Sequence, residues 1–286
     1  MSKLKNIFRL KQTMTETETE TLLNYIQKGS LPTQQEWGII LSTLHVQIAL
    51  KCVRYAHHIE SRCLRAVIKR QHQRLFQEVV RKITAIPPNI INVVMSVNSF
   101  YLYTCLNRGL DPNQVMANNQ TPLEYACRNY CLQHIQVLLS SNKIIVHKNI
   151  FSFMLRQIQL RQFAGMAFKR YNDDVTPNMI VEILAANVSE ALICVMEKLE
   201  EKYKGKQIWT EICFMLKCPI SLEYSTDLVK TPSNHYFDKE CLLVWVRNHQ
   251  NNPLTREQLY ESDLIDRSTF LPQLVNEINQ KIKRLA

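Results

Sequence analysis

Residues 217–259 constrain the fold of this chain more than any other segment, because they combine two proline-containing loops with too few metal ligands. A closed structural zinc site needs four Cys or His ligands, so a finger with two zinc sites needs eight. No C-x2-C pair occurs in or beside the segment, and we therefore expect no bound metal. Its candidate ligands are only Cys213, Cys218, His235, Cys241 and His249.

The order of elements in this segment carries a family resemblance. A Cys-Pro-Ile-Ser-Leu loop at 218–222 is followed by a strand pattern at 228–231, a His-Tyr-Phe-Asp-Lys-Glu turn at 235–240, a helix carrying Trp245, and a Pro-Leu-Thr-Arg loop at 253–256. This order resembles a RING-type finger, and without zinc ligands it resembles the U-box family of ubiquitin ligases. The resemblance implies a small α+β U-box domain at 212–286.

A U-box holds its loops by polar side chains where a RING uses zinc, and every buried member of such a network must be satisfied. The sequence departs from the usual family pattern at Leu228, at Asp266 with Arg267, and at Asn252, which replaces the first Cys of a Cys-Pro-Leu-Thr-Arg loop. We expect Arg267 or Asp266 to replace one hydrogen bond between the loops. The candidate network residues are Asp227, His235, Asp238, Lys239, Thr255, Arg256 and Glu257.

The resemblance also implies a scaffold mechanism without a nucleophile, in which ubiquitin is positioned for transfer. In the family, a ubiquitin-conjugating enzyme docks between the two loops and the central helix, and the matching residues here are Ile220, Leu222, Trp245 and Pro253. Arg256 matches the residue that bridges conjugating enzyme and ubiquitin, where a guanidinium fork is suitable. Alternatively, the apolar residues belong to the core and Arg256 completes the internal network with Asp227 or Asp238.

Cys241 permits a covalent alternative, because it follows the expected helix cap Asp238 and the helix dipole would lower its pKa. No residue is placed by the sequence to act as its base. We therefore interpret Cys241 as a small buried apolar residue.

Composition excludes several other classes of protein. The chain has 46% hydrophobic and 21% charged residues, which are values of globular proteins. Its five glycines form no phosphate-binding loop, so we expect no nucleotide cofactor and no other cofactor. Nine scattered cysteines, no apolar run of about 18 residues and no lipidation motif favour reduced thiols and a cytoplasmic location.

The net charge of +10 is concentrated between residues 51 and 85, which hold nine lysines and arginines against two acidic residues. We predict a basic helix at 51–82 and no general nucleic-acid-binding domain. This helix could meet an anionic lipid, a nucleic acid or an acidic partner. The solvated side of an amphipathic helix is the favoured interpretation, because its apolar face lacks bulky aromatic residues.

The rest of the chain has helical periodicity, and we expect helical residues 1–85, ankyrin-like repeats at 86–205 and a charged linker at 198–206. The polar segment 11–21 is expected to be a mobile arm or a helix N-terminus. Asn-Asn-Gln-Thr-Pro-Leu-Glu-Tyr-Ala at 118–126 and Val-Leu-Leu at 137–139 resemble one ankyrin repeat, with a weaker echo at 176–199. A single repeat cannot bury its own apolar face, so stacked neighbours are required.

These features favour a ubiquitin ligase whose residues 1–205 hold the protein substrate and whose U-box recruits the conjugating enzyme and ubiquitin. A non-catalytic interaction adaptor with a degenerate U-box is the alternative, and a zinc-dependent ligase for a ubiquitin-like modifier is a third. The combination also resembles effectors that intracellular bacteria deliver into host cytosol. The sequence does not identify the substrate, the conjugating enzyme, the chain linkage or the oligomeric state.

Overall fold

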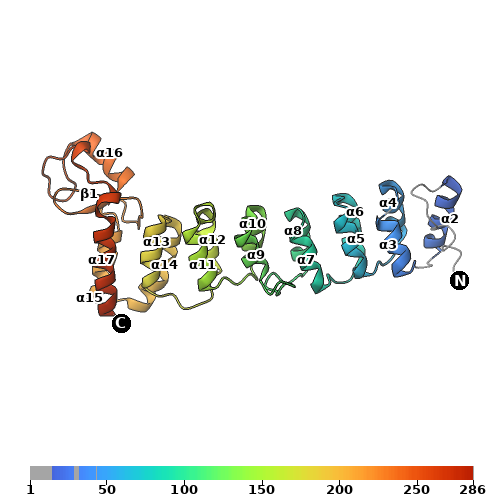
Figure 1. Ribbon diagram of the computed structural model, residues 1–286. Coiled ribbons are helices and arrows are strands. Elements are labelled where there is room, and N and C mark those ends of the chain that lie inside the picture. The colour runs from blue at the N-terminus through green and yellow to red at the C-terminus, as the bar shows by residue number, and fades with distance from the viewer. Residues whose placement is uncertain (1–14, 29–31, 43, 286) are drawn as a thin grey trace. The chain divides into compact units, whose positions relative to one another are not determined.

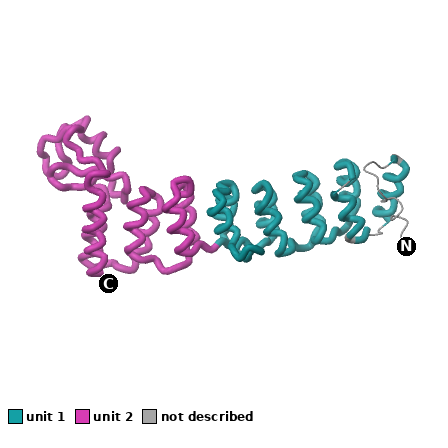
Figure 2. Tube along the Cα trace, in the orientation of Figure 1, with its two compact units in different colours: residues 1–144 teal, residues 145–286 magenta. Residues whose placement is uncertain are grey.

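The structure, a computed structural model, describes residues 15–28, 32–42 and 44–285. These residues are mainly helical, with a small antiparallel sheet of two strands, β1 (Leu228–Lys230) and β2 (Tyr236–Asp238). The chain divides into two compact units, residues 1–144 and 145–286, coloured separately in Figure 2. This division falls inside the segment 86–205, and the functional boundaries at 85 and 205 stay predictions.

Helix pairs build the first unit. Each pair packs against the next, so that α3 contacts α5 and α5 contacts α7, while α4 contacts α6 and α8 contacts α10 (Figure 1). Each helix thereby buries an apolar stripe against its neighbours. The elements are α2 (Glu16–Gln27), α3 (Gln34–Ser42), α4 (Val46–Tyr55), η1 (Ser61–Cys63), α5 (Leu64–Lys69), α6 (Gln73–Lys82), η2 (Pro88–Ile90), α7 (Ile91–Val94), α8 (Ser99–Asn107), α9 (Pro122–Arg128) and α10 (Leu132–Ser140).

Reciprocal capping boxes start α2 and α9. Of the polar segment 11–21, residues 11–14 lie outside the described residues, and Thr15 caps α2 together with Glu18. At α9, the hydroxyl of Thr121 accepts from the N–H of Glu124, whose carboxylate accepts from the N–H of Thr121 at 2.8 Å. Both boxes satisfy N–H groups that a helix leaves unpaired. The helix starts expected at these two sites are confirmed.

The basic segment 51–82 is not one helix, and this prediction was wrong. It comprises the end of α4, then η1 and α5, and finally α6. Gln71, with a left-handed φ of 54°, follows α5, and the ring of His72 caps α6 by accepting from the N–H of Leu75 at 3.2 Å. These local breaks distribute the basic residues over three helices.

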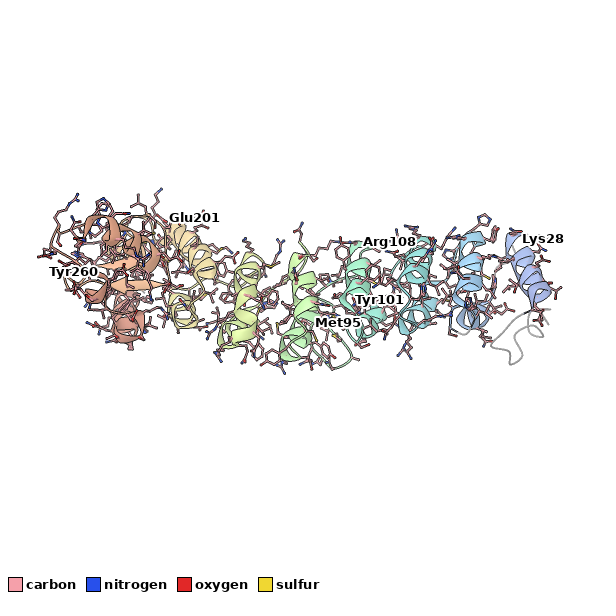
Figure 3. The ribbon with its side chains drawn as sticks, turned by 90° about the horizontal axis from the view of Figure 1, so that it is seen from above. Lys28, Met95, Tyr101, Arg108, Glu201 and Tyr260 are labelled. Atoms are coloured by element: carbon pink, nitrogen blue, oxygen red, sulfur yellow. The ribbon has the colours of Figure 1, made fainter. Side chains whose placement is uncertain are left out.

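Arg108 joins two successive helix pairs in the first unit. Its guanidinium donates to the carbonyls of Val80 at 3.2 Å and Ile83 at 3.0 Å, at the end of α6. The buried ring of Tyr101 lies 4.8 Å from that of Phe76, between α8 and α6. Figure 3 labels Tyr101 on α8 and Arg108 at the C-terminal cap of this helix. Free carbonyls at a helix end are thus satisfied by the following pair.

The second unit continues with helix pairs and then the sheet. Its α11 packs against α12 and α13, and α12 and α13 pack against α14. The elements are α11 (Lys148–Arg156), η3 (Ile158–Phe163), α12 (Ala164–Lys169), α13 (Asn178–Ala186), α14 (Ser189–Tyr203), α15 (Gln207–Leu216), the two strands, α16 (Lys239–His249), η4 (Glu261–Asp263) and α17 (Arg267–Leu285).

The charged segment 198–206 is largely helix, and its prediction as a linker was wrong. Helix α14 runs through Tyr203, and Leu199 within it is buried. Only a short turn with Gly205 at φ 84° separates α14 from α15. Apolar burial on one face of α14 outweighs the charged composition of the other face.

The C-terminal helix α17 ties the last part of the chain to these helix pairs. It packs against α15 and also against α13, and Figure 1 shows α15 and α17 side by side. Lys281 forms an ion pair with Glu211 on α15, and Arg267 donates to the carbonyl of Leu184 on α13. The small sheet is therefore anchored to the preceding helices and does not hang on a flexible segment.

All nine cysteines are free thiols, as predicted. Within the described ranges, no helix is both long and apolar enough to cross a membrane.

Candidate functional site

The C-terminal domain is built on a small apolar core between the sheet and α16. Val229 on β1 pairs with Phe237 on β2, and both side chains are buried. The predicted strand at 228–231 and the predicted helix carrying Trp245 are confirmed as β1 and α16. The buried cluster comprises Cys218, Val229, Phe237, Leu242, Val246 and Leu259.

The first loop, residues 218–223, is closed by its own backbone. The N–H of Cys218 donates to the carbonyl of Glu223 at 2.8 Å, and the N–H of Leu222 donates to the carbonyl of Cys218 at 2.8 Å. Leu222 has a left-handed φ of 62°. An antiparallel bridge between Lys217 and Tyr224 flanks the loop.

The second loop, residues 252–257, repeats this geometry. The N–H of Asn252 donates to the carbonyl of Glu257 at 2.8 Å, and the N–H of Arg256 donates to the carbonyl of Asn252 at 2.9 Å. Arg256 has a left-handed φ of 66°. An antiparallel bridge between Asn251 and Gln258 flanks this loop too. Cys-Pro-Ile-Ser-Leu-Glu and Asn-Pro-Leu-Thr-Arg-Glu are therefore two copies of one loop design.

The first loop and the residue just before the second loop contact the same side of α16. The hydroxyl of Ser221 in the first loop hydrogen-bonds Cys241. One helical turn later, the indole N–H of Trp245 donates to the carbonyl of Asn251 at 3.1 Å, beside the second loop. Residues four apart on a helix share a face. Cys241 and Trp245 thus lie on one face of α16, which contacts Ser221 of the first loop and Asn251 at the start of the second.

Apolar side chains remain exposed around this face. Leu222 is 66% exposed, so the alternative that it is a core residue was wrong. Ile220 packs on the edge of the core and is half-buried. Val244 on α16 and Leu254 in the second loop, at 59% and 50% exposure, join the surface and were missed by the sequence analysis. The signal for Leu254 was that it occupies, in the second loop, the position that Ile220 occupies in the first.

The predicted docking residues therefore sit at different depths. Leu222 projects into solvent, whereas Ile220, Trp245 and Pro253 are partly buried. The ring of Trp245 stacks on that of His249 at 4.1 Å, and its N–H is satisfied by Asn251. We name Ile220, Leu222, Val244, Trp245, Pro253 and Leu254 the two-loop surface.

Asn252 links the second loop to the end of the sheet. Its side chain is 1% exposed and donates to the hydroxyl of Ser233 at 2.7 Å and to that of Thr231 at 3.4 Å. Its amide oxygen accepts from the N–H groups of Leu254 at 2.9 Å and Thr255 at 3.3 Å. These four hydrogen bonds satisfy the NH₂ group and the oxygen of the buried amide. The prediction that Arg267 or Asp266 supplies the link was wrong.

Arg267 and Asp266 make other contacts. Arg267 reaches the carbonyl of Leu184, and Asp266 forms an exposed ion pair with Lys239 at 3.4 Å. Exposed pairs of this kind contribute little to stability. His235 was also predicted as a network member, but its buried Nδ1 has no hydrogen-bond partner among the described residues.

Asp238 organises the first loop and α16. One carboxylate oxygen accepts from the N–H of Cys241 at 3.0 Å, and the other accepts from the hydroxyl of Ser225 at 2.8 Å. That hydroxyl in turn accepts from the N–H of Asp227 at 3.0 Å. The carbonyl of Asp227 accepts from the N–H of Lys239 at 2.9 Å. Asp238 is confirmed as a network member, whereas Asp227 takes part only through its backbone. Ser225 is a member that sequence reasoning missed.

Arg256 does not belong to this network. Arg256 is exposed, and within the described part of the chain its guanidinium has no hydrogen-bond or ion-pair partner. Both carboxylate oxygens of Asp238 are occupied by Ser225 and Cys241. The alternative that Arg256 completes an internal network with Asp227 or Asp238 was wrong. Thr255 and Glu257, its neighbours, pair with each other at 2.9 Å.

Cys241 is protonated at neutral pH. Burial, followed by the hydrogen bond to Asp238 and its negative charge, raises the thiol pKa to about 11. The expectation that the helix dipole would lower this pKa was wrong, because desolvation and the nearby carboxylate dominate. Its side chain packs on the edge of the core, as expected for a small apolar residue.

Among the described residues, no three His, Cys, Asp or Glu side chains come together as a metal site. A comparison with protein families matches residues 212–280 to the U-box domain. Neither a curated protein nor a solved structure matched the chain. U-box domains typically bind ubiquitin-conjugating enzymes, and their family generally comprises ubiquitin ligases. Residues 212–280 thus carry a U-box domain that associates the chain with ubiquitin transfer.

Proposed function

We propose that the protein is a ubiquitin ligase whose U-box docks a ubiquitin-conjugating enzyme on the two-loop surface. The observation that carries this proposal is that two loops of the same backbone design flank α16, which contacts Ser221 in one and Asn251 beside the other. Leu222 is exposed in the first loop, and Arg256 in the second has no partner among the described residues. An exposed apolar cluster beside a fixed cation is suited to docking another protein.

The roles within the site follow from burial and charge. Leu222, Val244 and Leu254 offer apolar area that a partner can cover, while Ile220, Pro253 and Trp245 form the rigid base beneath it. Arg256 stands free to donate several hydrogen bonds to carbonyl oxygens at the junction of conjugating enzyme and ubiquitin.

Catalysis by this site would be positional. With the Cys241 pKa at about 11, no thiolate is available nearby to accept ubiquitin. Holding the thioester in a reactive orientation removes part of the entropic barrier to attack by a substrate lysine. The chain itself then forms no covalent intermediate.

The helix pairs before the U-box would hold the substrate. Successive helix pairs, one of which starts with a capped Thr-Pro-Leu at Thr121, are typical of ankyrin-like repeats. Such repeats use stacked helices as binding surfaces. Because α17 anchors the U-box to α13 and α15, the second unit would present the conjugating enzyme at a fixed distance from its own helix pairs.

Discharge of ubiquitin from a panel of charged conjugating enzymes to free lysine tests this proposal. The full-length protein is expected to accelerate discharge, and Ile220→Ala, which removes apolar area from the base of the surface, is expected to abolish most of the gain. If the folded wild-type protein binds conjugating enzymes but accelerates discharge from none of them, a non-catalytic adaptor function replaces the ligase.

A further inference from the structure

A cavity of about 550 Å³ lies in the first unit, far along the sequence from the U-box. One wall comes from η1 and α5, and the other comes from the double proline and the start of α7, which packs on α5 (Figure 1). Its lining comprises Ser61, Arg62, Arg65, Pro87, Pro88, Asn89, Ile90 and Val93.

The cavity is positively charged and its cations are unpaired. Arg62 and Arg65 are exposed, lie three residues apart on consecutive turns, and make no hydrogen bond or ion pair within the described residues. No lining residue carries a carboxylate. The structure therefore holds two guanidinium groups at one opening without an internal counterion.

Three other basic residues of the segment have structural partners. Arg70 donates to the carbonyl of Leu41 at 3.0 Å, and Arg81 pairs with Glu78 at 3.3 Å. Lys82 donates to the carbonyl of Arg54 at 3.3 Å. The side chains of Lys51, Arg54, Lys69 and Arg74 are exposed and, like those of Arg62 and Arg65, have no partner among the described residues. What distinguishes Arg62 and Arg65 is that both line one cavity.

We propose that this cavity binds a phosphate group on a segment of a partner protein, the substrate if the proposed ligase function holds. A phosphate dianion offers three acceptor oxygens, which two guanidinium forks satisfy, and the Ser61 hydroxyl and Asn89 amide supply neutral donors. A single carboxylate would occupy only one fork. Clustered arginines are a recurring means of recognising phosphorylated segments.

The cavity fits a peptide better than a membrane or a nucleic acid. A volume of about 550 Å³ exceeds a bare phosphate and leaves room for neighbouring residues against Pro87, Pro88 and Val93. The lining has no aromatic residue for stacking on a base. Among described residues 51–100, Tyr55 is the one large apolar side chain that is exposed, so bulky anchors for a membrane surface are lacking.

Fluorescence anisotropy tests the proposal on the full-length protein at physiological salt. The probes are three labelled peptide libraries with a fixed central phosphoserine, phosphothreonine or phosphotyrosine, and their unphosphorylated counterparts. We expect one phosphorylated library to bind at least tenfold more tightly than its counterpart. Arg62→Glu with Arg65→Glu should abolish the difference, and the milder Arg62→Gln with Arg65→Gln should reduce it.

The matched control is Lys51→Glu with Arg74→Glu, which changes the net charge equally at exposed positions outside the cavity. It should retain the preference for phosphate. Equal loss in both charge-reversed proteins, or binding of vesicles containing anionic lipid without binding of any phosphorylated library, overturns the proposal. This assay contains no conjugating enzyme, so it is independent of the ligase function. Peptide binding without ubiquitin discharge would refute only the ligase function. Ubiquitin discharge without peptide binding would refute only the cavity proposal.

Discussion

Leu222 and Arg256 occupy the same position in two loops with one backbone design. Each has a left-handed φ, 62° and 66°, and each donates its N–H to the carbonyl four residues earlier, at 2.8 and 2.9 Å. Such a conformation costs a residue with a side chain about 1–2 kcal/mol. The fold thus holds one apolar and one cationic side chain outward at corresponding points of the two-loop surface.

Replacing Leu222 separates docking from stability. Because Leu222 is 66% exposed, Leu222→Ala should leave the melting temperature unchanged but weaken binding of the conjugating enzyme by about 1–2 kcal/mol, roughly five- to thirtyfold. Phe214→Ala is the matched control, since Phe214 is 75% exposed on α15, outside the two-loop surface. Calorimetric titration measures the affinity of each variant for the conjugating enzyme. Equal affinities of the two variants would contradict the assigned surface.

Asn252 is expected to hold the second loop in place. Asn252→Ala leaves the N–H groups of Leu254 and Thr255 without their acceptor and should destabilise the loop by about 1–3 kcal/mol. Hydrogen exchange of residues 251–258 should rise accordingly. Asn248→Ala serves as control, because Asn248 is exposed and bonds only the carbonyl of Val244. Unchanged exchange in Asn252→Ala would mean that the loop is held by other contacts.

The stability of the U-box should depend on the helices before it. A fragment that starts at residue 212 cuts α15 and removes Trp209, which is buried. It also loses the contacts of α17 with α13, including Arg267 to Leu184. The melting temperature should therefore rise from fragment 212–286 to 206–286 and again to 145–286. Equal melting temperatures would show that the U-box is independent of its neighbours.

Alkylation tests the protonation state of Cys241. With a folded-state pKa of about 11 against an ordinary 9.0, its reaction with iodoacetamide at pH 8 should be at least about a hundredfold slower than in an unfolded peptide of residues 236–246.

The same pKa shift makes stability depend on pH. The thiol contributes its stabilisation fully below pH 9, and this is lost as the pH rises toward 11, because the unfolded state loses the proton first. For the alkylation experiment, mass spectrometry of the peptide that contains alkylated Cys241 measures the rate of the iodoacetamide reaction. Cys241→Ala should discharge ubiquitin at the wild-type rate, and loss of activity in that variant would support a covalent mechanism.

Local sequence patterns predicted the elements of the U-box correctly. The strand pattern at 228–231 corresponds to β1, and Asp238 was identified as the cap of α16. Capping residues and strands depend on neighbouring residues, which a sequence displays directly. The helix start at Thr121 was visible for the same reason.

Polar contacts between residues far apart in the sequence were harder to predict from the sequence. Arg267 or Asp266 was expected to hold the loops, whereas the buried neutral side chain of Asn252 holds the second loop against Thr231 and Ser233. Burying a neutral group costs less than burying a charge, and this preference could have been anticipated. By contrast, nothing local in the sequence indicates that Arg267 reaches back to Leu184.

Arg256 provides the most direct test of the ligase proposal. Arg256→Ala removes a guanidinium without an internal partner, so the protein should keep its circular dichroism and most of its affinity for the conjugating enzyme. An interaction made only when ubiquitin is positioned for attack should lower the discharge rate more than it weakens binding. The measurement is single-turnover discharge of a ubiquitin-charged conjugating enzyme at saturating ligase. A rate at least tenfold below wild type, with Arg256→Lys in between, is predicted, and a wild-type rate in the folded Arg256→Ala protein would contradict the account.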